Sequence, residues 1–269
     1  KVTIVGIDDF STGRRDALDR AVTFYEGSIC DEKLLERIFK KHRPEYVFHF
    51  AALPYVSLSV EQPAKTTYTH VYGTALLLEK SRDYGVRRFI YSSSCAIYGN
   101  AKRLPVRETD APMPLSPYGL QKFFGEPLCA LFSRLYGLDT VSLRYFNVFG
   151  PGQYGGGAYA SVISAWLESL YGFKRGRSRL EGDGKQTRDF CYVQNVVDAN
   201  IRAMRSRRRF AGAAINIGNG APTDLLTVQR LIEKYRGQHF SLDLRPARVG
   251  DVRHSYADIG KARRLLGYR

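Results

Sequence analysis

The stretch RFIYSSSCAIYG, residues 88–99, decides the fold of this chain. Its apolar beginning predicts a buried strand over 88–92, and the periodicity of 117–136 predicts a long helix after it. The same alternation runs outward in both directions, with further strands expected at 2–7, 22–25, 46–50 and 140–144 and further helices at 31–41 and 63–84. This order predicts an α/β fold with a doubly wound parallel sheet, whose ligands bind at the carboxyl ends of the strands.

A looser pattern follows residue 145 and indicates a second domain. Helices are expected at 159–171, 195–205 and 224–235, and a strand at 213–217. We therefore expect a sheet domain over 1–145 and a smaller, substrate-binding domain over 146–269. The segment 188–205 is expected to return to the sheet domain.

The composition excludes several classes of protein. The chain has 269 residues, 44% of them hydrophobic, which is enough for a full core. No run approaches the ~20 apolar residues of a membrane helix, so we expect no membrane partner. The four cysteines have neither metal-ligand spacing nor a disulfide pattern. We expect reduced thiols, no metal site and a cytoplasmic protein.

The net charge of +15 is unusual and could attract an anionic partner. The basic residues are spread along the chain, apart from a cluster over 205–209 at the end of a predicted helix. Positive charge suits a helix C-terminus because of the helix dipole. Since no nucleic-acid motif accompanies the cluster, we expect a solvated surface and no nucleic-acid partner.

Three residues near the fold-deciding stretch can carry chemistry. Tyr118 and Lys122 are four residues apart on a predicted helix and share a face. An ammonium group beside a phenol is expected to lower the phenol pKa from about 10, which makes a general base for a sugar hydroxyl. Ser94 ends the preceding strand and can hydrogen-bond the same oxygen. A tyrosine–lysine pair alone is weak evidence, because helix surfaces often produce one.

Several motifs in order strengthen this interpretation. The stretch over 92–99 is followed by Ser116, Pro117 and Tyr118, with Lys122 and Glu126 on the same helix. LRYFNVFGP over 143–151, GDG over 182–184 and TRDF over 187–190 come next. Together they resemble the extended short-chain dehydrogenases/reductases, in particular the UDP-glucose and UDP-N-acetylglucosamine 4-epimerases of the nucleotide-sugar epimerase/dehydratase family.

The resemblance implies a Rossmann domain that holds NAD and a 4-epimerase reaction on a UDP-sugar. Tyr118 would take the proton from the sugar 4-hydroxyl while hydride moves to NAD, giving a transient 4-keto sugar. Ser94 would help to relay the proton, and Lys122 would also hold the nicotinamide ribose. The resemblance further implies a homodimer.

The cofactor residues that the resemblance implies gather at the ends of the early strands. Asp8 would accept hydrogen bonds from the adenosine ribose, which favours NAD over NADP. The full set is Asp8, Asp9, Ser11, Thr12, Gly13, Ser28, Ile29, Phe50, Ala51, Ala52, His70, Ser92, Tyr118, Lys122 and Tyr145.

The substrate residues that the resemblance implies lie mostly in the second half. The set is Ser94, Tyr118, Asn147, Gln153, Val162, Arg188, Arg248, Asp251 and Ser255. Arginine forks suit phosphate oxygens, so Arg188 and Arg248 are expected at the diphosphate. Ser255 stands where a tyrosine would restrict the site to glucose and galactose, and a serine leaves room for an N-acetyl group.

The chain also departs from the family pattern. Ser28 replaces an aspartate at the adenine, His70 an asparagine at the cofactor, and Tyr55 a serine in the sugar pocket. Glu181 stands where many relatives stack an aromatic ring on uracil. The glycine-rich turn that receives the pyrophosphate, with its first strand and helix, is not seen; we expect the sequence to be a piece of a longer protein.

Three alternatives stay open. A sugar 4,6-dehydratase would need an Asp-Glu pair after the catalytic Ser94, where Cys95 and Ala96 stand. A UDP-uronate decarboxylase has no supporting feature of its own. A catalytically silent dinucleotide-fold binding module is opposed by the intact catalytic set.

Overall fold

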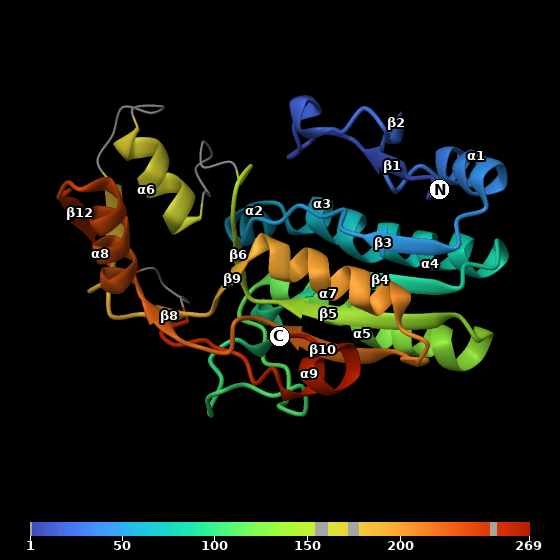
Figure 1. Cartoon of the computed structure of the whole chain (residues 1–269). Coiled ribbons are helices and arrows are strands. Elements are labelled where there is room, and N and C mark those ends of the chain that lie inside the picture. Colours follow the sequence, from blue (N-terminus) through green and yellow to red (C-terminus); the bar gives the residue numbers. More distant parts are fainter. Residues whose placement is uncertain (1, 154–160, 172–177, 248–251) are drawn as a thin grey trace. The chain divides into compact units, whose positions relative to one another are not determined.

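The structure, a computed structural model, describes residues 2–153, 161–171, 178–247 and 252–269, and these form two compact units (Figure 1). Unit 1 comprises residues 1–97, 116–144 and 200–215, and unit 2 comprises 98–115, 145–199 and 216–269. The expected domains differ from these units in two segments. Residues 98–115 belong to unit 2, and the segment that returns to unit 1 is 200–215 instead of 188–205.

Unit 1 is built on parallel strands. Two of them, β1 and β2, pair with each other, and a four-stranded sheet has the order β10-β5-β4-β3. The strands are β1 (Val5–Asp8), β2 (Thr23–Glu26), β3 (Tyr46–His49), β4 (Arg88–Ser94), β5 (Asp139–Tyr145) and β10 (Ala213–Ile217). The expectation that 213–217 belongs to the smaller domain was wrong for 213–215, because β10 pairs with β5 in the main sheet, while residues 216 and 217 belong to unit 2.

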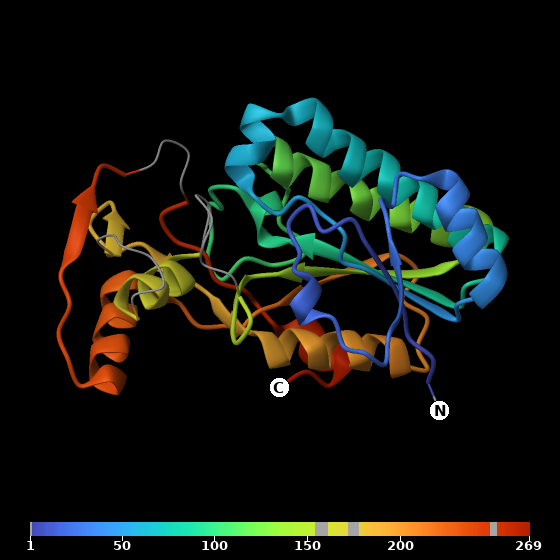
Figure 2. The same ribbon diagram turned by 90° about the horizontal axis from the view of Figure 1, so that it is seen from above.

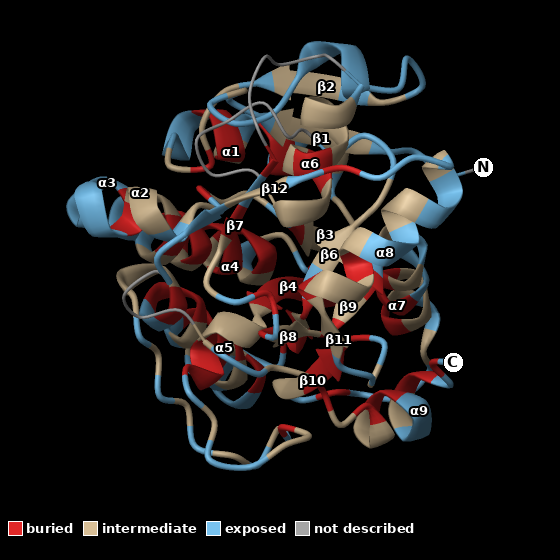
Figure 3. Ribbon diagram, turned by 90° about the vertical axis from the view of Figure 1, so that its left-hand side faces the viewer, coloured by how far each residue is buried: buried red, intermediate tan, exposed pale blue. Residues whose placement is uncertain are grey.

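The two central strands of this sheet are the most buried part of the chain. β4 and β5 each bury six of seven residues, as expected for parallel strands covered on both faces (Figure 3). Helices α4 (Gly73–Asp83) and α5 (Pro117–Tyr136) lie side by side on one face of the sheet. The end of α7 (Val193–Arg205) lies on the other face (Figure 2). Strand β4 therefore ends in a rigid, enclosed setting.

The helices of unit 1 follow the predicted order with one interruption. The expected helix over 63–84 is broken by a π-helical turn, η2, between α3 and α4. The elements are η1 (Arg15–Ala17), α1 (Glu32–His42), α2 (Val56–Glu61), α3 (Pro63–Thr67), η2 (Tyr68–Tyr72), α4 (Gly73–Asp83), α5 (Pro117–Tyr136) and η3 (Cys95–Tyr98). Asp31 caps α1 by accepting from Leu34 N over 3.0 Å, as its residue type predicts.

A buried arginine joins the start of β4 to the end of the α7 segment. Arg88 Nε donates to Asp139 Oδ2 over 2.8 Å. Its other nitrogens donate to the carbonyl oxygens of Ala203, Met204, Ser206 and Arg208. Because the guanidinium satisfies several carbonyls left open at the end of a helix, residues 203–208 are fixed against the sheet.

The described part of unit 2 contains three two-stranded ribbons and several helices around a second core. Trp166, Leu180 and Phe240 are buried at the centre of that core. The pairs are β6 (Asn147–Phe149) with β9 (Phe190–Tyr192), β7 (Ser178–Glu181) with β12 (Leu242–Arg245), and β8 (Thr187–Arg188) with β11 (Thr223–Asp224). The helices are α6 (Val162–Leu170), α7 (Val193–Arg205), α8 (Leu225–Arg236) and α9 (Gly260–Leu266).

Asp189 organises the backbone of unit 2 from a fully buried position. Its carboxylate accepts from the backbone N–H groups of Asn219, Gly220 and Ala257 over 2.6, 3.0 and 3.0 Å. Burial raises its pKa, and these three hydrogen bonds oppose the rise. Across the described ranges, no helix combines the length and the hydropathy needed to cross a bilayer.

Candidate active site

The end of β4 and the beginning of α5 bring the predicted catalytic residues together in unit 1. Ser94 is the last residue of β4 and Tyr118 the second residue of α5. The side chain of Ser94 is near enough to the phenol of Tyr118 to lower its pKa. Lys122 lies one turn further along α5 and is buried. The proximity expected from the sequence is therefore seen for Ser94 and Tyr118.

The first turn of α5 is held in place by two serines. Ser116 Oγ accepts from Gly119 N over 3.2 Å, which is an N-cap, and Pro117 occupies the first helical position. Ser59 Oγ, from α2, accepts from Tyr118 N over 3.0 Å. The backbone of Tyr118 is thereby fixed by a second helix, and no feature of the sequence had indicated Ser59.

The phenol of Tyr118 does not have the lowered pKa that the sequence predicted. Burial raises its pKa to about 12; the hydrogen bond from Ser94 opposes this rise and nearby Cys95 adds to it. A phenolate in an enclosed site loses its hydration, and this cost exceeds the effect of the serine. The expectation that the Lys122 ammonium would lower the pKa of Tyr118 towards neutrality was therefore wrong.

The ammonium group of Lys122 is directed at the strand that carries Ser94. Nζ donates to the carbonyl oxygen of Ser92 over 2.9 Å and lies 5.4 Å from the ring centroid of Tyr91. Burial lowers the pKa of Lys122 to about 8. Because its ammonium group donates to a carbonyl and faces an aromatic ring, Lys122 is held against β4.

The predicted ribose-binding residues form a tight turn after β1. Asp8 Oδ1 accepts from Phe10 N over 2.7 Å, and Asp9 Oδ1 accepts from Ser11 N over 2.9 Å. A Cβ added to Gly13 would lie 3.3 Å from Asp8 Oδ1, so the turn folds closely over that carboxylate. Asp8 is exposed and keeps a second carboxylate oxygen for ribose hydroxyls, which fits NAD. Thr12 is exposed in the same turn.

The remaining predicted cofactor residues differ in how far they are buried. Ile29 is buried in the core, and Ser28 Oγ accepts from Cys30 N over 3.1 Å. Phe50 is exposed and its ring stacks on that of Phe48 at 6.3 Å. Ala51 and Ala52, small and half-buried, follow it. Tyr145, assigned to unit 2, is the last residue of β5.

Two predicted substrate residues come together in unit 2. Arg188 Nη1 donates to the carbonyl oxygens of Thr187 and Arg253 over 2.9 and 3.3 Å. Ser255 N donates to the same Thr187 carbonyl over 3.2 Å, and His254 Nδ1 is 3.0 Å from Thr187 Oγ1. Arg188 and Ser255 are therefore neighbours across the isolated bridge between Thr187 and His254, on two segments distant in sequence.

Gln153 and the start of α6 form a second group in unit 2. Gln153 Nε2 donates to Val148 O over 3.0 Å, and its Oε1 accepts from Ser161 Oγ and Ser164 Oγ over 3.1 and 2.9 Å. Val162 is the first residue of α6 and lies in the same turn. Asn147 begins β6 with an exposed side chain. The predicted residues Arg248 and Asp251 lie outside the described residues.

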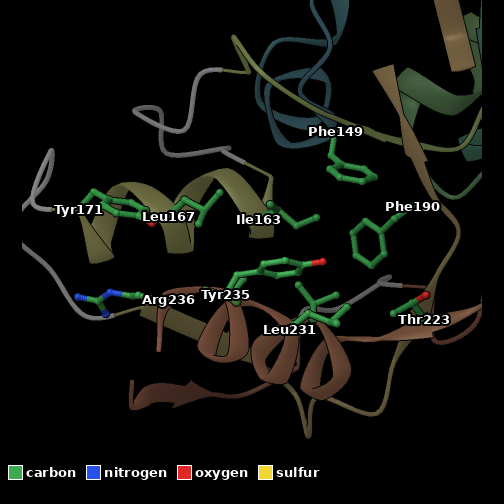
Figure 4. Close-up of a pocket in the computed structure, with 11 residues that line it drawn as sticks. Phe149, Ile163, Leu167, Tyr171, Phe190, Thr223, Leu231, Tyr235 and Arg236 are labelled. Carbon is green, nitrogen blue, oxygen red and sulfur yellow. The ribbon is translucent and has the colours of Figure 1, made fainter. Parts of the chain in front are cut away.

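A cavity of about 400 Å³ lies within unit 2 between α6 and α8 (Figure 4). Ile163 and Leu167 face Leu231 and Tyr235 across it, and Arg236 lies at one end. None of the predicted site residues lines this largely apolar space. This cavity is therefore not the predicted catalytic site, which consists of Ser94, Tyr118 and Lys122 in unit 1.

Comparison with known proteins gives consistent matches. A family model described as the NAD dependent epimerase/dehydratase family matches residues 1–218. The crystal structure of a UDP-glucose 4-epimerase with UDP-glucose from Thermotoga maritima is 41% identical, with a TM-score of 0.94 and coverage of 99% of this chain and 85% of that chain. A UDP-N-acetylglucosamine 4-epimerase from Methanobrevibacter ruminantium M1, in complex with UDP-N-acetylmuramic acid, is 31% identical, with a TM-score of 0.92 over 99% and 84%. The UDP-glucose 4-epimerase of Mycolicibacterium smegmatis is 34% identical over 272 residues, 99% of this chain and 85% of that protein.

Proposed function

Because this chain belongs to the NAD dependent epimerase/dehydratase family, we propose that it is a UDP-hexose 4-epimerase that uses NAD. The observation that carries the proposal is that Ser94 at the end of β4 acts on the phenol of Tyr118 at the start of α5, with the buried ammonium of Lys122 one turn further along α5. The positions after Ser94 hold Cys95 and Ala96 and supply no carboxylate for the removal of water. This favours epimerisation over dehydration.

Each catalytic residue has a task that its surroundings support. NAD, when bound, supplies the hydride acceptor for carbon 4 of the sugar. Tyr118 exchanges a proton with the 4-hydroxyl, and Ser94, whose side chain lowers the pKa of the phenol, helps to relay it. Lys122 brings positive charge to the same helix face and so favours the phenolate when the proton leaves. The sugar passes through a 4-keto form and is reduced again from the other face.

Unit 1 is the NAD-binding part of this proposal and unit 2 the nucleotide-sugar-binding part. The exposed carboxylate of Asp8 and the small residues Ala51 and Ala52 support the first assignment. Arg188 supports the second, since its guanidinium can meet diphosphate oxygens. Ser255, beside Arg188, leaves space that an acetamido group can use. The proposed substrates are therefore UDP-N-acetylglucosamine and UDP-N-acetylgalactosamine, with UDP-glucose and UDP-galactose also accepted.

A homodimer is also part of the proposal. Helix α5 carries Leu120, Phe124, Leu131 and Leu135 as exposed apolar side chains, at intervals of 4, 7 and 4 residues. This spacing places all four on one face of the helix, where a second copy can cover them. We assign the enzyme to the cytoplasm, where its four free thiols would stay reduced.

The test is direct assay of the full chain with NAD. Each of the four UDP-sugars is incubated separately, and proton NMR follows the anomeric signals of substrate and 4-epimer. We expect interconversion within the acetamido pair and within the glucose–galactose pair. A 4-keto-6-deoxy product in place of a 4-epimer, or no turnover of any of the four, would contradict the proposal.

A further inference from the structure

His70 lies at the centre of a buried hydrogen-bond network in unit 1. It is 2% exposed, in the π-helical turn η2. Leu53 N donates to its Nε2 over 2.8 Å, and its Nδ1 is 2.7 Å from Gln121 Oε1. A backbone N–H can only donate, so Nε2 is the acceptor and carries no proton. In the neutral ring Nδ1 therefore bears the proton and donates to Gln121.

Gln121 fixes the direction of the whole network. Its Nε2 donates to Thr66 Oγ1 and Thr67 Oγ1 over 3.0 and 2.9 Å. Because the hydroxyl of Thr66 gives its one proton to a backbone carbonyl, it accepts from the amide nitrogen of Gln121, so the amide oxygen is the atom that faces His70. Thr66 Oγ1 in turn donates to Pro63 O over 3.1 Å. Every donor in this chain of bonds has one consistent assignment.

The network joins the two parts of unit 1 that the reaction needs. Leu53 ends the cofactor loop, residues 50–53, which we assign to the NAD side. Gln121 immediately precedes Lys122 on α5. The rings of His70 and Tyr118 meet edge to face, with centroids 5.8 Å apart and an interplanar angle of 76°. One side chain thus contacts the cofactor loop, the catalytic helix and the catalytic ring.

The surroundings keep His70 uncharged. Burial and the charge of Lys122 lower its pKa to about 4, while the Gln121 bond opposes the shift. The titratable groups that face it are Lys122 and Tyr118 on α5 and His49 on β3. His49 Nε2 reaches the His70 backbone through Thr74 Oγ1, which donates to His70 O. Both ring nitrogens of His70 are engaged by protein atoms, so its role is not a direct hydrogen bond to NAD.

We propose that His70 is a positioning residue that fixes the cofactor loop and the ring of Tyr118 relative to each other. The inference rests on the proposed epimerase function. Protonation of Nε2 would turn an acceptor into a donor facing the Leu53 N–H, and the loop would lose its attachment to α5. The single proton arrangement described above is therefore the one that supports catalysis.

The first test observes the ring directly. Nitrogen-15-edited NMR of the full chain, with His70→Asn to assign the signals, reports which ring nitrogen is protonated. We expect Nδ1 protonated, Nε2 unprotonated and no titration from about pH 8 to about pH 5. A proton on Nε2, or titration near the usual histidine pKa, overturns the proposal. This measurement needs no enzymatic activity, so it stands apart from failure of the proposed function.

The second test uses Gln121→Glu, which keeps the side-chain shape but presents a carboxylate to Nδ1. The carboxylate favours the protonated ring. We expect kcat to acquire an acidic limb within about pH 5–8 that the wild type lacks, and NAD affinity to weaken over the same range. The double variant His70→Asn/Gln121→Glu has nothing to titrate at position 70 and should lose the limb. An unchanged profile in Gln121→Glu, or a limb that persists in the double variant, overturns the proposal.

The third test separates positioning from stability. His70→Phe keeps an aromatic ring beside Tyr118 but removes both hydrogen bonds, whereas His49→Phe alters another buried histidine of the same unit. Both variants should unfold at lower denaturant concentration. Only His70→Phe should lower kcat, by at least about tenfold, and weaken NAD binding measured by calorimetry. Equal effects of the two variants on kcat and on NAD affinity would show that His70 serves stability alone.

Discussion

Arg144 and Glu126 form a two-point ion pair in the interior of unit 1. Arg144 Nε and Nη2 donate to Glu126 Oε1 and Oε2 over 2.9 and 2.6 Å, and both side chains are buried. Ser93 Oγ donates to the same carboxylate. These residues come from three separate sequence motifs, on β4, α5 and β5. The pair binds β5 to the helix of Tyr118, and the Ser93 hydrogen bond binds the strand of Ser94 to the same helix, so the three motifs meet at the Glu126 carboxylate.

Removal of the Glu126 carboxylate should be costly to the fold. In Glu126→Ala the charge of Arg144 stays buried without its carboxylate, so we expect a loss of about 3–5 kcal/mol in the free energy of unfolding. Urea denaturation measures it. The matched control is Glu45→Ala, which removes an exposed partner of Arg87 and should leave the free energy of unfolding almost unchanged. Similar losses in both variants would contradict the assigned role of the pair.

Tyr118→Phe removes the ionisable oxygen and retains the ring against His70. Secondary structure and NAD affinity should be preserved, while epimerisation should fall by a factor of about 10²–10⁴, the usual contribution of a general acid–base group. Steady-state assay with UDP-galactose, and calorimetry with NAD, measure the two properties. Near-normal turnover in this variant would remove Tyr118 from the reaction.

Lys122 should impose a characteristic pH dependence on stability. Its pKa in the folded protein is about 8, below the usual value of 10.5. Between these two pH values the unfolded chain binds more protons at this site, so the free energy of unfolding should rise with pH, by up to roughly 3 kcal/mol. Denaturation of the wild type and of Lys122→Met over this pH range isolates the contribution of Lys122, because the two proteins share all other titratable groups. If the free energy of unfolding changes with pH in the same way in both proteins, folding does not lower the pKa of Lys122.

Ser255→Tyr should divide the substrates by size. A phenol ring in the space beside Arg188 should abolish turnover of UDP-N-acetylgalactosamine and spare UDP-galactose, because only the acetamido group needs that volume. Ser255→Ala is the control and should turn over both. If Ser255→Tyr handles both classes as the wild type does, Ser255 does not limit the sugar pocket and Tyr55 becomes the residue to examine.

The apolar face of α5 should determine the oligomeric state. Phe124→Asp puts a charge into the centre of the face formed with Leu120, Leu131 and Leu135. Light scattering should report a dimer for the wild type and a monomer for the variant. Tyr235→Asp, on the exposed part of α8 in unit 2, is the control and should stay dimeric. A wild-type monomer, or a dimeric Phe124→Asp, contradicts the assignment.

The sequence predicted the main elements because their patterns are local. Alternation placed β4 and α5, and the spacing of Tyr118 and Lys122 placed both on one helix. Features that depend on contacts distant in sequence were not predicted. The position of β10 beside β5, the raised pKa of Tyr118 and the support from Ser59 all follow from burial and packing. The break of the 63–84 helix at η2 has no sequence signal, and no feature of the sequence had indicated the role of Gln121.

The hydrogen bonds of the buried Arg88 guanidinium also affect the order in which the protein can fold. Its carboxylate partner is 51 residues further along the chain, and its carbonyl partners are 115 to 120 residues further. Until the ribosome has added those residues, the Arg88 guanidinium lacks the carbonyl partners that it has in the folded protein. Contacts so distant in sequence close late and slow the search for the native state. Unit 1 can therefore complete its sheet only after most of unit 2 has been synthesised, so a ribosome stalled before residue 200 should display an unfinished, protease-sensitive sheet.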